Sequence, residues 1–285
     1  MSPSKKADGN AAQAPTVRKA KVTSSAEIRA QAARKSGTGP FPPARRILAA
    51  DIGGTHVKFR VNTGDEVRKF ASGPGLTPSQ MCTQLQGMTA DWAYDVISLG
   101  YPGPVLHGKP VLEPHNLAPG WVGFDFSGAL GRPVKLINDA AMQALGAYRG
   151  GKLLFLGLGT GLGSAMVVNG VVEPMELAHL PYRKHTYEDY VGLRGLEKHG
   201  KKKWRVQVTE VVELLRAALE PDEIVLGGGN AELMRGLPTG VRLGDNANAF
   251  PGGFRLWDDE VNARPVTANT ATGSPAPVNT GFSGS

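Results

Sequence analysis

The feature that most constrains the fold is a unit that occurs twice, in which two apolar strands flank a turn rich in glycine. Residues 49–61 read AADIGGTHVKFRV, and residues 156–168 read LGLGTGLGSAMVV. Glycine lets the main chain approach an anion closely, and successive backbone N–H groups in such a turn form a nest that binds phosphate. A single unit is equally typical of an ordinary β-hairpin. Two units, with a third glycine turn in VLGGGN at 225–230, favour a phosphate site with turns on both sides of a cleft.

The remaining pattern predicts an α/β protein. Three apolar runs within 46–72 predict a β-meander, and helical spacing follows at 78–93. A strand leads into a helix at 133–148, and a long amphipathic helix precedes a short strand within 204–230. Meanders combined with crossover helices are typical of α/β domains. No GxxxxGK[ST] motif occurs, so the phosphate site is not a P-loop.

Positive charge is concentrated at the N-terminus. The chain has 285 residues, of which 41% are hydrophobic, and this suits one or two globular domains. The formal net charge is +7, but residues 1–46 alone carry +8, so the folded part gives no reason to expect a nucleic-acid partner. We predict a disordered basic tail over 1–44, with an organelle transit peptide as an alternative, and a second disordered tail over 261–285.

The sequence predicts a cytoplasmic protein without a membrane partner. No apolar stretch approaches the ~20 residues needed to cross a bilayer, and no signal-peptide core follows the basic N-terminus. Cys82 is the single cysteine, which excludes an internal disulfide and a zinc site with several cysteine ligands.

A candidate general base follows a predicted strand. INDAA at 137–141 places Asp139 at the junction between strand and helix. Phosphoryl transfer to a hydroxyl needs a base near the attacking oxygen, together with positioning and charge stabilisation around the phosphoryl group. Asn138 and Asp139 are also typical of a helix N-cap pair, so the residues by themselves leave both roles open.

Six motifs occur in the order found in one family of kinases. They are DIGGT with Lys58, GYPGPV, NDAAMQALGAY, GLGTGLG, ELAHLPY and IVLGGGN. By these motifs and their order the chain resembles the ROK sugar kinases, which belong to the actin-like, hexokinase-like ATPases. TYEDYVGLRGLEKHGKKKW at 186–204 and GDNANAFPGGFRLW at 244–257 are similar to the polyphosphate glucokinase branch of that family. The resemblance covers nearly all of residues 46–257 and neither tail.

The resemblance implies a two-domain α/β fold of the actin-like, hexokinase-like ATPase type, with a cleft between the domains. The expected N-terminal domain spans 45–137, and the expected C-terminal domain spans 138–244. A C-terminal helix within 245–260 is expected to pack back on the first domain. The family also implies a homodimer.

The resemblance assigns roles to individual residues. Asp139 would be the catalytic base that takes the proton from the attacking sugar hydroxyl, and Asp51 would hold Mg²⁺. The residues expected to bind the sugar are Asn116, Asn138, Glu176, His179 and Glu188. The residues expected to bind phosphate or nucleotide are Asp51, Gly53, Gly54, Thr55, Lys58, Gly159, Thr160, Gly161, Gly227, Gly228 and Gly229.

The segment that carries the expected sugar-binding residues departs from the family pattern. Most ROK proteins have a zinc site of one histidine and three cysteines here, whereas residues 179–190 read HLPYRKHTYEDY. We therefore expect no structural zinc, in agreement with the polyphosphate branch. Glu188 is placed by matching YEDY to the family's Glu-x-Tyr, and Ala178 stands where the family usually has glycine. His179 alone is also typical of a buried core histidine, but a helical segment would make it a neighbour of Glu176.

The expected activity is transfer of a phosphoryl group from polyphosphate, ATP or both to the 6-hydroxyl of glucose, with mannose as a second candidate acceptor. Residues 183–205 contain eight basic and three acidic residues, which suits a polyanionic donor or, equally, the solvated start of a helix. A ROK-type sugar-responsive regulator and a non-catalytic sugar-binding module are the alternatives. The regulator would need a helix-turn-helix before the kinase-like part, and residues 1–44 show no apolar periodicity for one.

Overall fold

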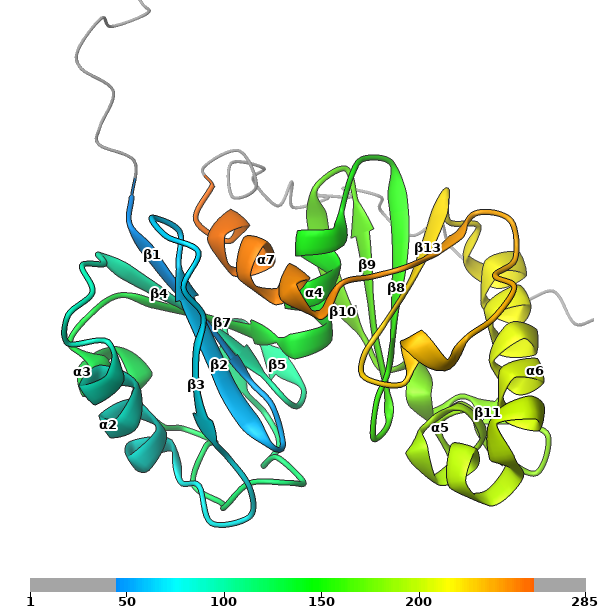
Figure 1. Ribbon diagram of the computed structural model, residues 1–285, viewed down its shortest axis with the longest axis horizontal. Coiled ribbons are helices and arrows are strands. Elements are labelled where there is room, and N and C mark those ends of the chain that lie inside the picture. Colours follow the sequence, from blue (N-terminus) through cyan, green and yellow to red (C-terminus); the bar gives the residue numbers. More distant parts are fainter. Residues whose placement is uncertain (1–44, 259–285) are drawn as a thin grey trace, which may run out of the picture. The chain divides into compact units, whose positions relative to one another are not determined.

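The computed structural model describes residues 45–258, which contain two five-stranded sheets of the same topology (Figure 1). Both predicted tails, and the last residues of the predicted 245–260 segment, lie outside the described residues. The strand order is β3-β2-β1-β4-β7 in one sheet and β10-β9-β8-β13-β14 in the other. In each sheet the first three strands along the chain form an antiparallel meander, and two further strands are added in parallel. The hairpin repeat in the sequence is therefore part of a repeat of whole sheets.

The strands and helices have the following bounds. The first sheet consists of β1 (Ile47–Ile52), β2 (His56–Val61), β3 (Arg68–Ala71), β4 (Val96–Tyr101) and β7 (Val134–Asn138). The second consists of β8 (Lys152–Leu158), β9 (Leu162–Val168), β10 (Val171–Met175), β13 (Glu223–Gly227) and β14 (Val241–Leu243). Two short hairpins pair β5 (Val105–Leu106) with β6 (Lys109–Pro110) and β11 (Pro181–Tyr182) with β12 (His185–Thr186). The helices are α2 (Pro78–Met88), α3 (Phe126–Leu130), α4 (Asp139–Ala147), α5 (Tyr187–Val191), α6 (Leu193–Leu219) and α7 (Ala249–Arg255), with single 3₁₀ turns η1 (Leu177–His179), η2 (Ala231–Leu233) and η3 (Asn246–Asn248).

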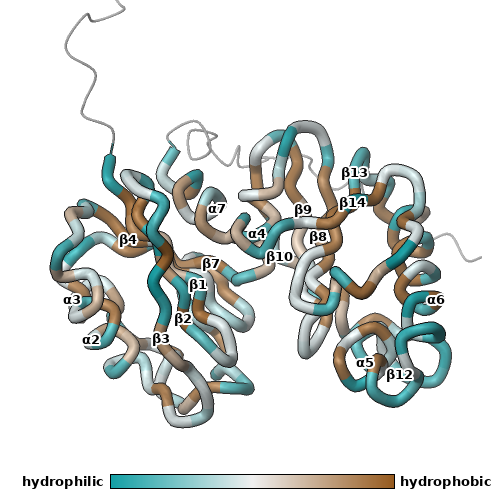
Figure 2. The backbone as a smooth tube through the Cα atoms, viewed as in Figure 1, coloured by the Kyte–Doolittle hydropathy of each residue, from teal (hydrophilic) through white to brown (hydrophobic). Residues whose placement is uncertain are grey.

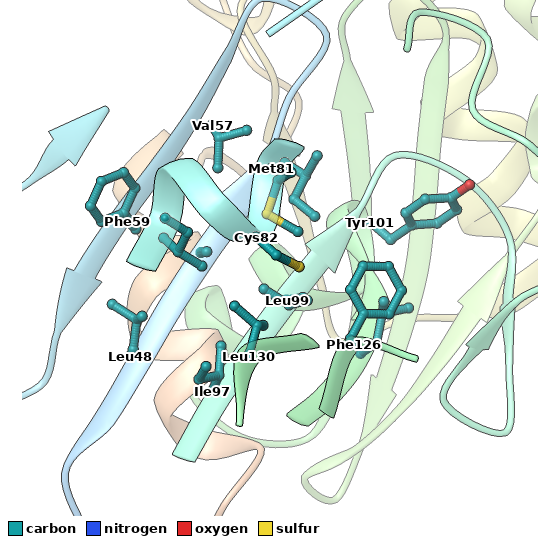
Figure 3. Packing of buried hydrophobic residues seen from close by; sticks show 14 of the residues in the cluster. Leu48, Val57, Phe59, Met81, Cys82, Ile97, Leu99, Tyr101, Phe126 and Leu130 are labelled. Atoms are coloured by element: carbon teal, nitrogen blue, oxygen red, sulfur yellow. The ribbon is translucent and has the colours of Figure 1, made fainter. Parts of the chain in front are cut away.

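The first sheet forms its core against α2 and α3. Strand β1 lies between a parallel and an antiparallel neighbour and is buried along almost its whole length, which explains its continuous apolar run. Helix α2 begins with a capping box between Thr77 and Gln80 and turns Met81 and Cys82 toward the sheet (Figure 3). Cys82 is thus a small core residue.

Helices α4 and α7 connect the two sheets. Helix α4 packs on β8 and β9 of the second sheet and also contacts β4 of the first, while α7 packs on both α4 and β1. The two helices cross at backbone distance, because a methyl group on Gly252 would lie 1.8 Å from the carbonyl oxygen of Met142. The Ser98 hydroxyl donates a hydrogen bond of 2.5 Å to the carbonyl of Gly253. The chain after the second sheet therefore returns to the first.

Helix α6 consists of two helical stretches that meet at Gly200, whose φ of 72° and ψ of 160° are not helical. The second stretch is the long amphipathic helix that the sequence predicts. The stretch after Gly200 buries Trp204, Val208 and Val211 against the second sheet. Among residues 45–258, no helix combines the length and the apolar character needed to cross a membrane.

Candidate functional site

A cavity of about 640 Å³ lies between the first two glycine turns and brings together most of the residues that the sequence predicts for the site. The predicted residues that line it are Gly54, Thr55, Asn116, Asn138, Asp139, Gly159, Thr160, Gly161, Glu176, His179, Glu188 and Gly228. The predicted residues that do not line it are Asp51, Gly53, Lys58, Gly227 and Gly229. Most of the predicted residues therefore line the cavity, and the exceptions lie behind or beside its wall.

The exceptions fall into two groups. Asp51 is half-buried near the end of β1 and pairs in register with Lys58 of β2, so both support the first turn from the sheet. Gly227 is buried at the end of β13, where a methyl group would lie 2.4 Å from the Phe155 ring. Gly227 therefore serves packing, whereas Gly229 is exposed.

Asp139 is held in place by the start of α4. Asn138 is the N-cap: its Oδ1 accepts a 3.1 Å hydrogen bond from the Ala141 N–H, and its Nδ2 donates one of 3.1 Å to the Gly103 carbonyl. The Asp139 carboxylate accepts a 2.7 Å hydrogen bond from the Ala140 N–H. The capping role considered for this pair is thus present, and the same geometry holds a carboxylate in the wall of the cavity.

The two aspartates have raised pKa values for related reasons. Burial raises the pKa of Asp139 to about 7, and the negative charges of Asp51 and Glu176 add to the shift, while the Ala140 N–H opposes it. Burial likewise raises the pKa of Asp51 to about 6, against the effect of Lys58. A carboxyl group with a pKa near 7 is suited to general base catalysis at neutral pH.

The aspartates also fit a divalent cation. Two neighbouring carboxylates whose pKa values are raised favour a compensating positive charge between them. Within residues 45–258 no group of three or more His, Cys, Asp and Glu side chains could hold a metal. Mg²⁺ in kinases characteristically takes one or two carboxylates and completes its octahedron with water and substrate phosphates, so this sparse donor set suits it.

Glu176 and His179 lie side by side at the end of β10. Glu176 precedes the 3₁₀ turn η1 and His179 ends it, and Glu176 Oε2 lies 3.9 Å from His179 Nε2. Both side chains are more than half exposed, so His179 is not a core histidine. The buried Ser164 holds this turn, because its hydroxyl donates to the Met175 carbonyl (2.7 Å) and accepts from the Leu177 N–H (3.1 Å).

Glu188 lies on α5 and packs against the second glycine turn. A methyl group on Gly161 would lie 2.2 Å from Glu188 Oε2, so only glycine allows this approach. The Leu193 N–H donates to the Thr160 carbonyl at 3.1 Å, which ties the turn to the start of α6. Asn230 from the third glycine turn donates to the Gly159 carbonyl at 3.1 Å.

The segment without zinc ligands is held by aromatic rings and an ion pair. The Tyr182 ring contacts Tyr187 and Tyr190, with centroids 5.5 Å and 5.0 Å apart. The Tyr182 hydroxyl donates to Glu210 of α6, and Arg183 forms a 2.6 Å ion pair with the same carboxylate. These contacts connect the β11–β12 hairpin, between His179 and Glu188, to the long helix.

The structure adds residues that the sequence did not single out. His115, Ser164, Met175 and Leu112 line the cavity. Ser72 supports the first turn from behind, donating from its N–H to the Thr55 carbonyl at 2.9 Å and from its hydroxyl to the Gly53 carbonyl. Ser164 belongs to the second glycine motif and could have been noticed there, whereas Ser72 lies in a loop without a pattern of its own.

Sequence comparison identifies curated relatives of known activity, although no family model matches the chain. The polyphosphate glucokinase of Mycobacterium tuberculosis (strain CDC 1551 / Oshkosh) is 28% identical over 208 residues, which is 65% of this chain and 78% of that protein. The kanosamine kinase of Amycolatopsis mediterranei (strain S699) is 30% identical over 145 residues, which is 45% of this chain and 47% of that protein.

Comparison of the folds identifies solved structures with the same architecture. The crystal structure of the inorganic polyphosphate/ATP-glucomannokinase from Arthrobacter sp. strain KM matches with a TM-score of 0.65 at 23% identity, over 76% of this chain and 98% of that chain. The ROK family glucokinase from Streptomyces griseus, in complex with glucose and AMPPNP, matches with a TM-score of 0.60 at 17% identity, over 74% of this chain and 98% of that chain.

The chain is similar in sequence to polyphosphate glucokinases and shares its fold with ROK family sugar kinases. The predicted resemblance and the predicted hexokinase-like α/β fold are confirmed. At the level of the family, the relatives support a sugar kinase.

Proposed function

We propose that this ROK relative transfers a phosphoryl group from polyphosphate, ATP or both to the 6-hydroxyl of glucose. The observation that carries the proposal is the position of Asp139, a carboxyl group with a raised pKa in the wall of a cavity between two glycine turns. Polar side chains suited to sugar hydroxyls share that cavity. Mannose is a second candidate acceptor.

In this proposal the cavity holds the sugar beside Asp139. Asn116, Asn138, Glu176, His179 and Glu188 supply amide, imidazole and carboxylate groups that pair with ring hydroxyls. Because each buried hydroxyl needs a partner, such a site rejects analogues that lack one. Asp139 accepts the proton of the attacking hydroxyl as the oxygen forms its bond to phosphorus and the bond to the leaving phosphate breaks.

The glycine turns hold the donor. Backbone N–H groups of Gly54, Thr55, Thr160 and Gly161 would contact the phosphate oxygens, with Gly228 of the third turn alongside. Lys58 would add positive charge near the first turn. Asp51 would hold Mg²⁺, which neutralises charge on the donor phosphates when bound.

The experiment that tests the proposal compares wild type with Asp139→Asn. General base catalysis contributes roughly 10²–10⁴-fold, so kcat for glucose phosphorylation should fall by that factor while glucose binding, measured by calorimetry, is kept. A variant that keeps more than about half of the wild-type kcat would contradict the assigned base. The donor is identified by assaying long-chain polyphosphate and ATP separately.

The same assay decides between the kinase and the two other classes. A sugar-responsive regulator or a non-catalytic module would bind glucose and transfer no phosphoryl group from either donor. A wild-type protein that binds glucose without turnover would therefore remove the kinase proposal. Turnover with ATP alone would reduce it to an ATP-dependent glucokinase.

A further inference from the structure

A second, basic cavity lies outside the proposed active site. It has a volume of about 430 Å³ and is formed by the end of the β11–β12 hairpin, by α5 and by the first turns of α6. Its lining residues are Lys184, His185, Asp189, Tyr190, Arg194, Lys198 and His199. Figure 2 shows the tube around β12 largely in teal, the colour of hydrophilic residues.

The single carboxylate of this pocket is already satisfied. One oxygen of Asp189 accepts hydrogen bonds from the Thr186 N–H and hydroxyl, at 3.2 Å and 2.8 Å, and the other accepts from Arg194 at 2.9 Å. The hydroxyl and N–H of Thr186 accordingly hold the pKa of Asp189 below its ordinary value. Lys184 and Lys198 form no ion pair with any residue of the described part of the chain. The pocket therefore keeps two uncompensated ammonium groups.

Aromatic rings form part of the lining of the pocket. The rings of Tyr190 and His199 are stacked, with centroids 5.7 Å apart and an angle of 8° between their planes, and His185 contacts Tyr190 at 6.1 Å. The two imidazoles can donate hydrogen bonds to an anion that the lysines attract. The pocket is thus built for a ligand with several negative charges.

A third cavity shares lining residues with both the basic pocket and the proposed active site. That cavity, of about 520 Å³, is lined by Thr160 and Gly161 of the second glycine turn and by Asp189 and Arg194, which also line the basic pocket. Glu188 and Glu197 line the third cavity as well and repel an anion there. An anion is therefore attracted to the basic pocket and not to the third cavity.

We propose that this pocket binds a condensed phosphate chain outside the catalytic cavity. The inference rests on the proposed use of polyphosphate. The bound phosphate chain would be either the far end of a long donor or a separate molecule. The eight basic residues of 183–205 differ in whether they line this pocket and whether they already have a partner. Arg183 is paired with Glu210 and Arg205 with the Leu233 carbonyl, both at 2.6 Å, while Lys201, Lys202 and Lys203 lie exposed after Gly200, outside the pocket.

The test uses two full-length double variants of equal charge. Lys184→Ala/Lys198→Ala removes the two uncompensated lysines of the pocket, and Lys202→Ala/Lys203→Ala removes two exposed lysines nearby. Binding of long-chain polyphosphate is measured by calorimetry at several salt concentrations, and KM is measured for long-chain polyphosphate, triphosphate and ATP. All four side chains are exposed, and unchanged KM for ATP reports an intact fold.

The pocket variant should bind long-chain polyphosphate about tenfold more weakly, with a salt dependence about one unit shallower, while the control variant changes little. A parallel rise in KM for long-chain polyphosphate alone would identify the far end of the donor, whereas unchanged KM would identify a separate chain. Equal weakening in both variants, or in neither, would overturn the proposal, as would absence of binding to wild type. Binding without turnover would refute polyphosphate as donor but leave the pocket standing.

Discussion

The first two glycine turns resemble one another in sequence, but they are supported by different partners. The first, at Gly53–Thr55, follows the half-buried Asp51 and is held from behind by Ser72. The second, at Gly159–Gly161, is held by Leu193 at the start of α6 and by Asn230 of the third turn. The first is therefore a turn beside a candidate metal ligand, and the second packs against Glu188, a proposed sugar-binding residue.

The largest expected difference between the turns comes from the same substitution in each. Gly161→Ala would place a methyl group 2.2 Å from Glu188 Oε2, so the Glu188 carboxylate must swing out of its position in the site. Since misplacement by about 1 Å can cost about 10²-fold, we expect kcat/KM to fall by that factor.

Gly54→Ala and Gly159→Ala provide the comparison for this prediction. A methyl group on Gly54 would lie 3.3 Å from Asn116 Cβ, and one on Gly159 would meet nothing within 4 Å. We expect glucose affinity to fall a few-fold for the former and almost not at all for the latter, because neither substitution displaces Glu188. A loss at Gly159 as large as that at Gly161 would show that the contact with Glu188 is not the cause.

The raised pKa of Asp139 predicts a pH dependence. Burial raises it to about 7, with a contribution from Asp51, and the base must be ionised to accept a proton. kcat/KM should therefore fall about tenfold for each pH unit below about pH 7, measured from about pH 5 to about pH 9. A flat profile in this range would contradict the role of Asp139.

The same raised pKa predicts that the stability of the fold decreases with rising pH, whereas activity increases. Because the pKa of Asp139 is higher in the folded than in the unfolded protein, the protonated form stabilises the fold at low pH, and this contribution is lost as pH rises toward 7. At pH about 8, Asp139→Asn should unfold at a higher temperature than wild type, by roughly 2–4 °C for each 1 kcal/mol gained. A lower Tm would indicate that the carboxylate is stabilised by its hydrogen bonds more than it is destabilised by burial.

A smaller effect is expected when the hydroxyl of Ser164, which holds the turn with the proposed sugar-binding residue Glu176, is removed. Ser164→Ala would leave the Leu177 N–H without its partner and release the turn that carries Glu176. A buried donor left unpaired costs roughly 1–3 kcal/mol, so KM for glucose should rise about tenfold, with KM for the donor unchanged. Ser164→Thr, which keeps the hydroxyl, is the conservative control, and an equal rise in both KM values would contradict a role specific to the sugar.

The smallest effect is expected from Ser72→Ala, which removes a hydroxyl that holds the first glycine turn. Ser72→Ala removes one hydroxyl hydrogen bond to the Gly53 carbonyl but keeps the backbone bond to Thr55. A hydrogen bond of this kind contributes roughly 0.5–1.5 kcal/mol, so KM for the donor should rise about fivefold at constant KM for glucose. A larger rise in KM for glucose than in KM for the donor would contradict the proposal that Ser72 supports the donor side of the site.

The two strand-and-turn units could be recognised without a structure because their pattern is local. Alternating or continuous apolar residues set the strands, glycines set the turns, and Asn138 sets the start of α4. The sequence did not predict the shorter helical stretch from Leu193 that precedes the long helix and meets it at Gly200. Gly227 was expected to face phosphate, but its place is decided by the Phe155 ring from the neighbouring strand β8.

By itself the sequence determined the order of strands and helices and the glycine turns, because each depends on neighbours along the chain. Through its resemblance to the ROK sugar kinases it also indicated about half of the residues that line the cavity. Only the tertiary structure decided that the sheets repeat each other in topology, that Ser72 and Ser164 support opposite sides of the site, and that α7 returns to the first sheet. It also separated the lysines of the basic pocket from those outside it. The physical reason is that burial, pKa and pairing depend on groups brought together from distant parts of the chain, which no local pattern records.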